Sequence, residues 1–235
     1  MARGEPGYTA VPKWHMVLAE LAPQDRATLA AHMNRMVLPP YSLLFQQGEP
    51  SDRLWVVESG RARVFQTSEH GHTFTQAVCI GGTSVGLAAV VARARRDTSA
   101  ETIDTCTLQV MPADVLLALM HTLPGLGAGV ARLLASTAME SFARAEALVV
   151  QPARVRLARI LVSLAGEPAS GQEGALQIDG LTQEELARMV GVSRTWVVLS
   201  LKQLEERGLI RRYRRRIVIP DGASMMRFVQ QDALA

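Results

Sequence analysis

The sequence predicts an α+β fold in three parts: an antiparallel β-barrel or roll, one long helix and a C-terminal winged helix-turn-helix. Three observations carry this prediction. Short apolar runs between residues 41 and 111 are separated by glycine-containing turns. Residues 126–150 run for 25 residues without proline. A helix–turn–helix pattern at residues 181–210 is followed at once by a run of arginines.

Length and charge set the broad class. A chain of 235 residues with 48% hydrophobic residues forms one or two domains with a full core. The formal net charge is +3, but residues 151–235 carry 13 Lys and Arg against 9 Asp and Glu, and residues 1–150 carry 12 against 13. A polyanionic partner is therefore expected to meet the C-terminal part.

Several function classes find no support. Cys79 and Cys106 are too few for a disulfide framework or a zinc cluster. No nucleophile–base pair, metal cluster or P-loop is recognisable, so we expect no enzyme. The N-terminus lacks the apolar region of a secretion signal, and no run of about 18 apolar residues occurs. We expect a protein of the reducing cytoplasm without a membrane partner.

The first predicted domain, residues 13–122, contains the β-structure. Two short helices are expected at Trp14–Leu21 and Gln24–Met36, and Pro39–Pro40 ends helical structure. Glycines then recur about every 11 residues, which favours an antiparallel barrel or roll and leaves a loop-rich sandwich as the alternative. The expected strands are Leu43–Phe45, Leu54–Val57, Ala62–Phe65, Phe74–Ile80 and Leu108–Met111.

Residues 123–150 are predicted to form a dimerisation helix. A short helix opening at Pro112 and Asp114 ends near Pro124, and the long helix Leu126–Val150 follows. Small and apolar residues repeat along it with the 4,3 spacing of a coiled-coil seam. The opposite side, with Val130, Leu133, Thr137, Phe142 and Val149, is expected to pack on the roll; a monomeric core helix is the alternative. The predicted dimer interface comprises Ala131, Leu134, Ala138, Ser141, Ala145 and Leu148.

Residues 151–235 form the predicted DNA-binding domain. A helix at Ala153–Ala165 and a short strand at Gln177–Asp179 precede the helix-turn-helix. Thr182 and Glu185 have the spacing of a capping box. Gly191 suits the turn, and Ser193 caps the second helix, whose buried stripe is Val197, Leu201 and Leu204. Two packed helices of an ordinary bundle are the alternative interpretation.

The segment after the second helix reads as a wing. Gly208 ends the helix, and Leu209–Ile210 and Ile217–Ile219 are the expected wing strands. Six arginines fall within ten residues here, and we expect no matching acidic residues beside them. Phosphate binding is the favoured interpretation, and a solvated charge run is the alternative. The six are Arg207, Arg211, Arg212, Arg214, Arg215 and Arg216.

The second helix is expected to read base sequence. A turn of 100° per residue puts Thr195, Val198, Leu199 and Lys202 opposite the buried stripe, and Arg194 lies at the helix N-terminus. Val198 and Leu199 could only contact thymine methyls or pack within the protein. The candidate DNA contacts are Thr182, Gln183, Ser193, Arg194, Thr195, Leu199, Lys202, Arg212, Arg214, Arg215 and Arg216.

The chain resembles the CRP/FNR family of bacterial transcription regulators over about residues 24–222. The resemblance rests on LFQQGEPSDRLWVVESGRARV, RLARILVSLAG, LTQEELARMVGVSR and KQLEERGLI, and on Gly48, Gly60, Gly71, Gly82 and Gly86. It implies a roll like a cyclic-nucleotide-binding domain and a homodimer whose recognition helices enter successive major grooves of a twofold-symmetric site in double-stranded DNA. It also implies RNA polymerase as a partner and a signal relayed by the long helix.

The phosphate cassette departs from the family pattern. Members that bind cyclic nucleotides have a Glu for the ribose hydroxyl and an Arg for the cyclic phosphate. Here Leu87 is aligned with that Glu and Asp97 with that Arg; Arg95 and Arg96 are not expected to reach the same point. Cyclic AMP is therefore not expected to bind tightly. The resemblance gives as effector-pocket candidates Gly86, Leu87, Ala88, Asp97, Thr98, Ser99 and Ser141.

Other departures concern cofactors and base reading. The iron–sulfur branch needs cysteines near the N-terminus, and none precedes Cys79, so an iron–sulfur cluster is excluded. Haem is possible in principle, but His70 and His72 on a turn read as exposed polar residues, and His15, His32 and His121 are scattered. Both thiols are expected to be buried and inert. Thr195 and Leu199 replace the Glu and second Arg of the family's recognition helix, so the usual half-site is not expected.

Overall fold

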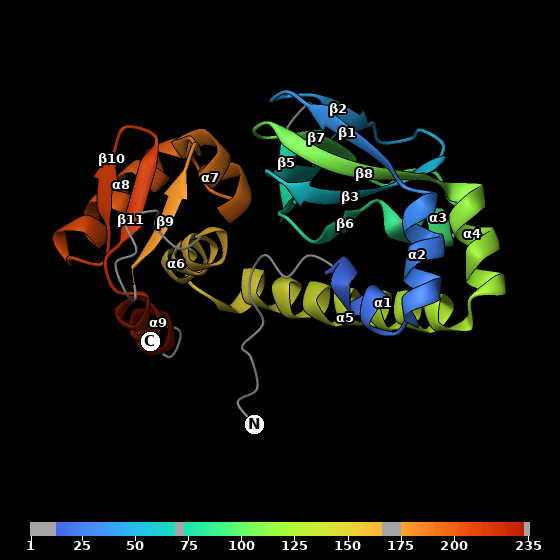
Figure 1. Ribbon diagram of the computed structural model, residues 1–235. Coiled ribbons are helices and arrows are strands. Elements are labelled where there is room, and N and C mark those ends of the chain that lie inside the picture. The colour runs from blue at the N-terminus through green and yellow to red at the C-terminus, as the bar shows by residue number, and fades with distance from the viewer. Residues whose placement is uncertain (1–12, 69–72, 166–174, 233–235) are drawn as a thin grey trace. The chain divides into compact units, whose positions relative to one another are not determined.

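The computed structural model describes residues 13–68, 73–165 and 175–232 (Figure 1). The chain divides after Glu140 into two compact units. We call them the roll unit, up to residue 140, and the C-terminal unit, from residue 141. His70 and His72 lie outside the described residues.

Two antiparallel sheets of four strands each form the roll. The first has the order β1 (Asn34–Leu38), β8 (Cys106–Pro112), β3 (Arg53–Ser59) and β6 (Thr83–Val85). The second has the order β2 (Leu43–Phe45), β7 (Ser99–Thr102), β4 (Ala62–Thr67) and β5 (Thr73–Cys79). The predicted antiparallel roll is confirmed.

Strand β3 contributes side chains to two separate apolar clusters, one on each of its faces. Its side chains alternate between two faces. Trp55 and Val57 point into the roll, among buried residues of both sheets. Leu54 and Val56 point to the other face, where they pack under a helical layer. That layer consists of α1 (Trp14–Ala19), α2 (Pro23–Ala31), α4 (Ala113–Thr122) and the first part of α5 (Pro124–Val150).

The structure corrects the predicted elements of the roll at three places. The helix expected over Gln24–Met36 ends at Ala31, and Asn34–Leu38 forms β1, which pairs with β8. Strands β6 and β7 were not expected. The short helix α3 (Leu87–Val91), which opens at Gly86, was not expected either.

Helix α5 is continuous, as predicted, but the residues that it buries and exposes differ in part from those expected. Val130 and Leu133 are buried in the roll unit, as expected. Phe142, which we expected to pack on the roll, is 76% exposed, and Met139 is 73% exposed. Residues 138, 139 and 142 share one side of a helix because they are one, three and four positions apart. The apolar side left open is therefore larger than the small-residue seam alone.

No single helix in the described part of the chain is both long and apolar enough to cross a membrane. Only α4 taken together with the first part of α5 has that length and composition, as a pair bent by 116°.

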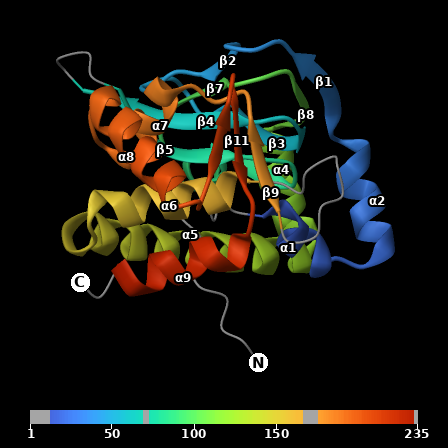
Figure 2. The same ribbon diagram turned by 90° about the vertical axis from the view of Figure 1, so that its left-hand side faces the viewer.

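Helix α6 (Ala153–Leu164) lies at the centre of the contacts of the C-terminal unit (Figure 2). Helices α7 (Gln183–Val190) and α9 (Gly222–Asp232) contact α6, and α8 (Arg194–Glu206) contacts α7. Strands β10 (Arg211–Tyr213), β11 (Arg216–Ile219) and β9 (Leu176–Asp179) form an antiparallel sheet in that order. The predicted winged helix-turn-helix is confirmed.

Local sequence signals set the helix-turn-helix. The Thr182 hydroxyl accepts from the Glu185 N–H at 3.2 Å, and the Glu185 carboxylate accepts from the Thr182 N–H at 2.6 Å, so the capping box is complete. Gly191 ends α7 with a φ of 75°, where a glycine is favoured. Ser193 caps α8 by accepting from the Trp196 N–H.

Two features of this unit differ from expectation. The first wing strand was expected at Leu209–Ile210, but β10 begins at Arg211, because Ile210 turns into the core at 1% exposure. Helix α9 was not expected. It covers α6, and its Met225 and Val229 are fully buried.

Candidate nucleic-acid interface

Helix α8 has one buried and one open side. Val197, Leu201 and Leu204 are buried, as predicted. Thr195, Leu199 and Lys202 are exposed on the opposite side, while Val198 is half-buried. Lys202 pairs with Glu206 one turn further along, at 3.7 Å. The predicted reading face is thus open, with Val198 at its margin.

The wing arginines divide into two groups. Within the described part of the chain, Arg211, Arg214 and Arg215 are exposed and form no ion pair. Arg212 and Arg216 have acidic partners, contrary to the expectation that none lay nearby: Arg212 pairs with Glu205 and Arg216 with Asp179. The sixth arginine of the run, Arg207, ends α8 and lies 5.4 Å from the centroid of the Phe228 ring. Three charges per wing are therefore available to a polyanion without breaking an existing pair. Arg211 was not among the candidate contacts.

Arg212 fastens the wing to α8. Its guanidinium donates to Glu205 Oε2 at 2.6–2.8 Å, and its backbone N–H donates to Glu205 Oε1 at 2.9 Å. These hydrogen bonds lower the pKa of Glu205, the guanidinium having the larger effect. Only the folded chain brings the two residues together, so Arg212 positions the wing against the second helix and is not a free phosphate ligand.

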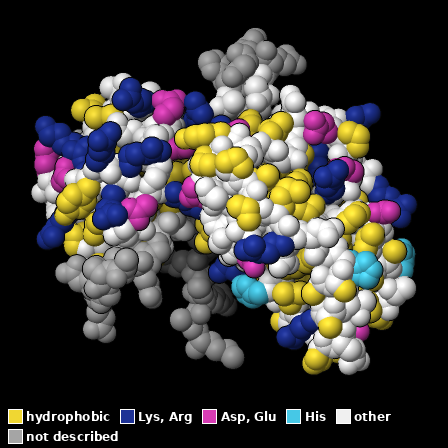
Figure 3. All heavy atoms as spheres, turned by 45° about the horizontal axis from the view of Figure 1, so that its top comes forward, with side chains coloured by type: hydrophobic (Ala, Val, Ile, Leu, Met, Phe, Trp, Pro, Cys, Tyr) yellow, Lys and Arg dark blue, Asp and Glu magenta, His cyan; other side chains and the backbone are white. Residues whose placement is uncertain are grey.

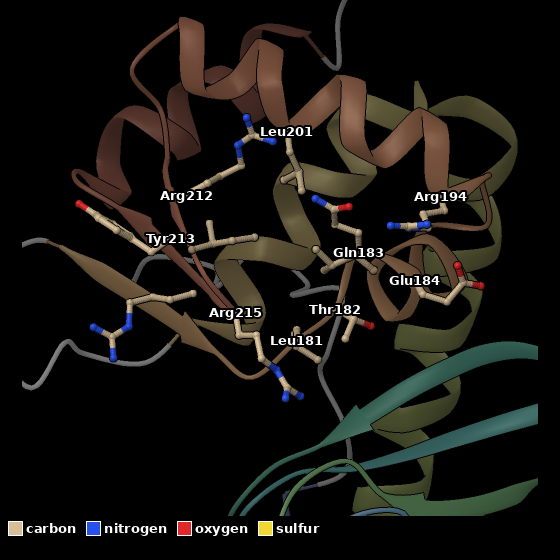
Figure 4. A pocket seen from close by; sticks show the side chains of 12 residues that line it. Leu181, Thr182, Gln183, Glu184, Arg194, Leu201, Arg212, Tyr213 and Arg215 are labelled. Atoms are coloured by element: carbon tan, nitrogen blue, oxygen red, sulfur yellow. The ribbon is translucent and has the colours of Figure 1, made fainter.

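A groove of about 560 Å³ lies between α7, α8 and the wing. Figure 4 shows Arg194 and Gln183 pointing into this space from the two helices, with Arg215 approaching from the wing and Tyr213 turned away. Lys and Arg side chains gather on the C-terminal unit, at the left of Figure 3. A groove lined by several arginines suits a phosphate backbone.

Two candidate contacts are already occupied by helix capping. The Thr182 hydroxyl donates to Glu185 Oε2 at 2.8 Å while accepting from the Glu185 N–H. Ser193 accepts from the Trp196 N–H at 3.2 Å. Both residues lie at helix N-termini, where backbone N–H groups also face outward. Thr182 and Ser193 thus fix the N-termini of α7 and α8, whose backbone N–H groups are the candidate contacts.

The tip of the wing has a strained backbone. Arg215 adopts a φ of 58°, in the left-handed region that disfavours residues with a side chain. Its carbonyl accepts from the Gly180 N–H at 2.8 Å, a bond that holds the tip against the end of β9. The arginine is therefore presented at a fixed point on the wing.

A second candidate site lies in the roll, at the cassette. Arg96, and not Asp97, reaches Gly86: its Nη1 donates to the Gly86 carbonyl at 2.8 Å, and its Nη2 donates to the Arg53 carbonyl. Its guanidinium lies 4.2 Å from the centroid of the Phe45 ring. Arg96 is 2% exposed, whereas Asp97 is exposed. Of these two neighbouring residues, Arg96 is therefore the one that points inward.

Arg96 is held as an internal cation. A Cβ on Gly86, whose φ is 80°, would overlap its guanidinium, so the close contact depends on glycine. Burial lowers the pKa of Arg96, and the charges of Asp52, Asp97 and Glu49 act against this shift. With carbonyl acceptors on both terminal nitrogens, the guanidinium joins the start of α3 to the start of β3.

The remaining cassette candidates are scattered. Leu87 is buried in the apolar layer beneath the helices, and Ala88 is exposed. Thr98 and Ser99 are buried, and Ser99 Oγ accepts from the Gln47 N–H at 2.9 Å. Ser141 is exposed on α5, in the C-terminal unit. The structure therefore brings Gly86 into contact with Arg96, which was not among the predicted pocket residues.

The thiols and histidines give no sign of cofactor chemistry among the residues that the structure describes. Cys79 and Cys106 are fully buried, and burial raises the pKa of Cys106 to about 11. A protonated, buried thiol is a poor redox sensor. His15, His32 and His121 are exposed and separate, and in these parts of the chain no group of three or more potential ligands could hold a metal ion.

Comparison with known families matches both units. Residues 35–122 match the cyclic nucleotide-binding domain. Residues 155–228 match the Crp-like helix-turn-helix domain. The two matches lie where the structure places the roll and the winged helix-turn-helix.

Known relatives match most of the chain. A CRP-like cAMP-activated global transcriptional regulator of Mycobacterium tuberculosis is 27% identical over 87% of this chain and 92% of the relative. The cyclic AMP receptor protein of Thermus thermophilus is 28% identical over 81% and 86%. Among solved structures, the c-di-GMP-responsive regulator CLP of Xanthomonas campestris has a TM-score of 0.70 at 22% identity, over 84% and 99%.

Proposed function

Because this chain is a DNA-binding transcription regulator of the CRP/FNR family, we propose that it acts as a homodimer on a twofold-symmetric DNA site and is not controlled by cyclic AMP. RNA polymerase is the proposed further partner. The observation that carries the DNA site is a set of exposed cations on α8 and the wing that form no ion pair within the described part of the chain: Arg194, Arg211, Arg214 and Arg215.

Each part of this surface has a distinct task. The wing arginines bind phosphates and position the protein without selecting a sequence. The outward residues of α8 enter the major groove and select base pairs. Two such surfaces related by a twofold axis require a site with the same symmetry.

Selection from random duplexes tests this function. The purified full chain is incubated with a pool of random double-stranded DNA, and the bound fraction is sequenced after several rounds. We expect enrichment of an inverted repeat with half-sites about one helical turn apart. Binding that depends steeply on salt without any enriched motif would instead indicate a nonspecific DNA binder.

The dimer is proposed to form along α5. Ala131, Ala138 and Ala145 are exposed, but alanines alone bury little area. The exposed Met139 and Phe142 supply large side chains on the adjoining side of the helix. Leu134, by contrast, is half-buried against the roll core. The side chain of Leu148 is outside the described set.

We expect Phe142→Glu to weaken dimerisation at least about tenfold, because it places two like charges in the proposed seam. Sedimentation velocity across micromolar concentrations measures the change. Tyr41→Glu is the matched control, since Tyr41 is similarly exposed, at 63%, but lies on the roll. A dimer unaffected by Phe142→Glu would contradict this placement of the seam.

The cassette residues do not fit cyclic AMP. The resemblance assigns the ribose hydroxyl to a carboxylate, but Leu87 offers no acceptor and is buried at 3% exposure. The terminal nitrogens of Arg96 already donate to the carbonyls of Gly86 and Arg53. A cyclic phosphate would have to reach a guanidinium that is 2% exposed and already bound to two carbonyls.

Calorimetric titration of the full chain with cyclic AMP is expected to show no binding at micromolar concentration. The Mycobacterium tuberculosis relative, which is named as cAMP-activated, serves as the positive control in the same buffer. Micromolar or tighter binding by this chain would show that the proposal about control is wrong.

A further inference from the structure

Leu199 is a large apolar side chain on the outward side of α8. It is 58% exposed, although the same helix buries Val197, Leu201 and Leu204 almost completely. At 100° per residue, Leu199 lies within about 10–15° of the direction opposite to the centre of that buried stripe. It therefore cannot join the core without a rotation of the whole helix.

The neighbours of Leu199 on this side are polar or cationic. Thr195 lies one turn before it, and Lys202 lies three residues after it; both are exposed. Arg194 points into the adjoining groove from the start of the same helix. An apolar centre between cationic flanks is complementary to a duplex groove, which has phosphates on its two sides and base edges between them.

The chemistry of leucine limits what it can recognise there. A leucine side chain neither donates nor accepts a hydrogen bond, so it cannot pair with guanine or adenine edges. The thymine 5-methyl group is the apolar feature of the major groove. Cytosine presents an amino donor that a leucine would desolvate without a partner.

We propose that Leu199 is a specificity-determining residue, which selects a thymine in each half-site through the 5-methyl group. This proposal rests on the proposed function, since it requires α8 to lie in the major groove. The proposal requires more than DNA binding alone: removing one thymine methyl group at one position of the half-site must lower the affinity.

Uracil replacement tests the proposal, because uracil differs from thymine only by the absence of the 5-methyl group. Each thymine of the selected half-site is replaced in turn by deoxyuridine, and the affinity of the full chain is measured. We expect one position per half-site at which the methyl group contributes about 3–10-fold in affinity. Leu199→Ala should reduce the thymine-to-uracil ratio at that position to near one.

Two control variants separate the causes. Lys202→Ala, on the same exposed side, should leave the thymine-to-uracil ratio unchanged. Neutralising the wing arginines should weaken binding to both duplexes equally. Thermal unfolding of Leu199→Ala should match that of the wild type, because the side chain is exposed.

The outcomes are distinguishable. If random selection enriches no sequence, the proposed function fails and this proposal fails with it. If a motif is enriched but every thymine-to-uracil ratio is near one, or Leu199→Ala keeps the wild-type ratio, only the role of Leu199 is overturned. Leu199 would then face a protein partner or remain in water.

Discussion

Replacing Arg211, Arg214 and Arg215 together by glutamine is expected to weaken binding to duplex DNA by about 10³–10⁴-fold at 0.15 M salt. These exposed wing arginines have no ion pair within the described part of the chain. A dimer presents each of them twice, so about six phosphates lose their partner. The slope of log affinity against log salt concentration should fall by about 5, as measured by fluorescence anisotropy across a salt series.

Two controls make this result specific. Arg35, Arg53 and Arg132 are exposed arginines of the roll unit, and their triple replacement by glutamine removes the same charge. That variant should keep most of the salt slope. Arg212→Gln should change binding for another reason than the loss of a phosphate contact. Arg212 is held by Glu205, and its replacement frees the wing from α8. Equal effects of both triple variants would mean that net charge, and not the wing, drives binding.

Gly60→Ala is expected to lower the free energy of unfolding of the roll unit by more than about 3 kcal/mol. Gly60 has a φ of 85° in the turn between β3 and β4. A Cβ there would overlap the Thr105 carbonyl oxygen and lie 2.9 Å from Cys106 Cα and Sγ. The neighbouring backbone belongs to the start of β8 and cannot move without breaking the sheet. Urea unfolding followed by tryptophan fluorescence measures the loss.

Gly48→Ala is the matched control. Gly48 has a similar φ of 89°, but a Cβ there would meet nothing within 4 Å. This variant should cost only the backbone strain, about 1–2 kcal/mol. The difference between the two variants isolates the overlap with β8. If they were equally destabilised, the close approach at Gly60 would not be the cause.

The helix-turn-helix was predictable because its determinants are local. The capping box of Thr182 and Glu185, the turn at Gly191 and the stripe of α8 all lie within short spans of sequence. Strand β1 was missed because its pairing with β8 joins residues about 70 positions apart, which the periodicity of residues 24–36 does not reveal. Strand β7, Ser99–Thr102, contains small and polar residues whose burial depends on both neighbouring strands.

The candidate site was predictable in its residue types but not in their partners. The arginine run indicated phosphate binding, but the attachment of Arg212 to Glu205 and of Arg216 to Asp179 appears only when the wing folds back. In the roll, the family pattern drew attention to Asp97, but the structure buries Arg96 and leaves Asp97 exposed. A shift of one residue reverses which side chain points inward, and sequence spacing alone does not fix it.

The left-handed backbone of Arg215 affects two properties of the protein in opposite directions: the stability of the fold and the proposed binding of phosphate. A glycine at this point of the turn would relieve roughly 1 kcal/mol of strain and give a more stable fold. The chain instead keeps a cation at the outermost point of the wing, where it can approach a phosphate. The left-handed backbone at Arg215 therefore lowers the stability of the fold, and the proposed phosphate contact accounts for an arginine at this position.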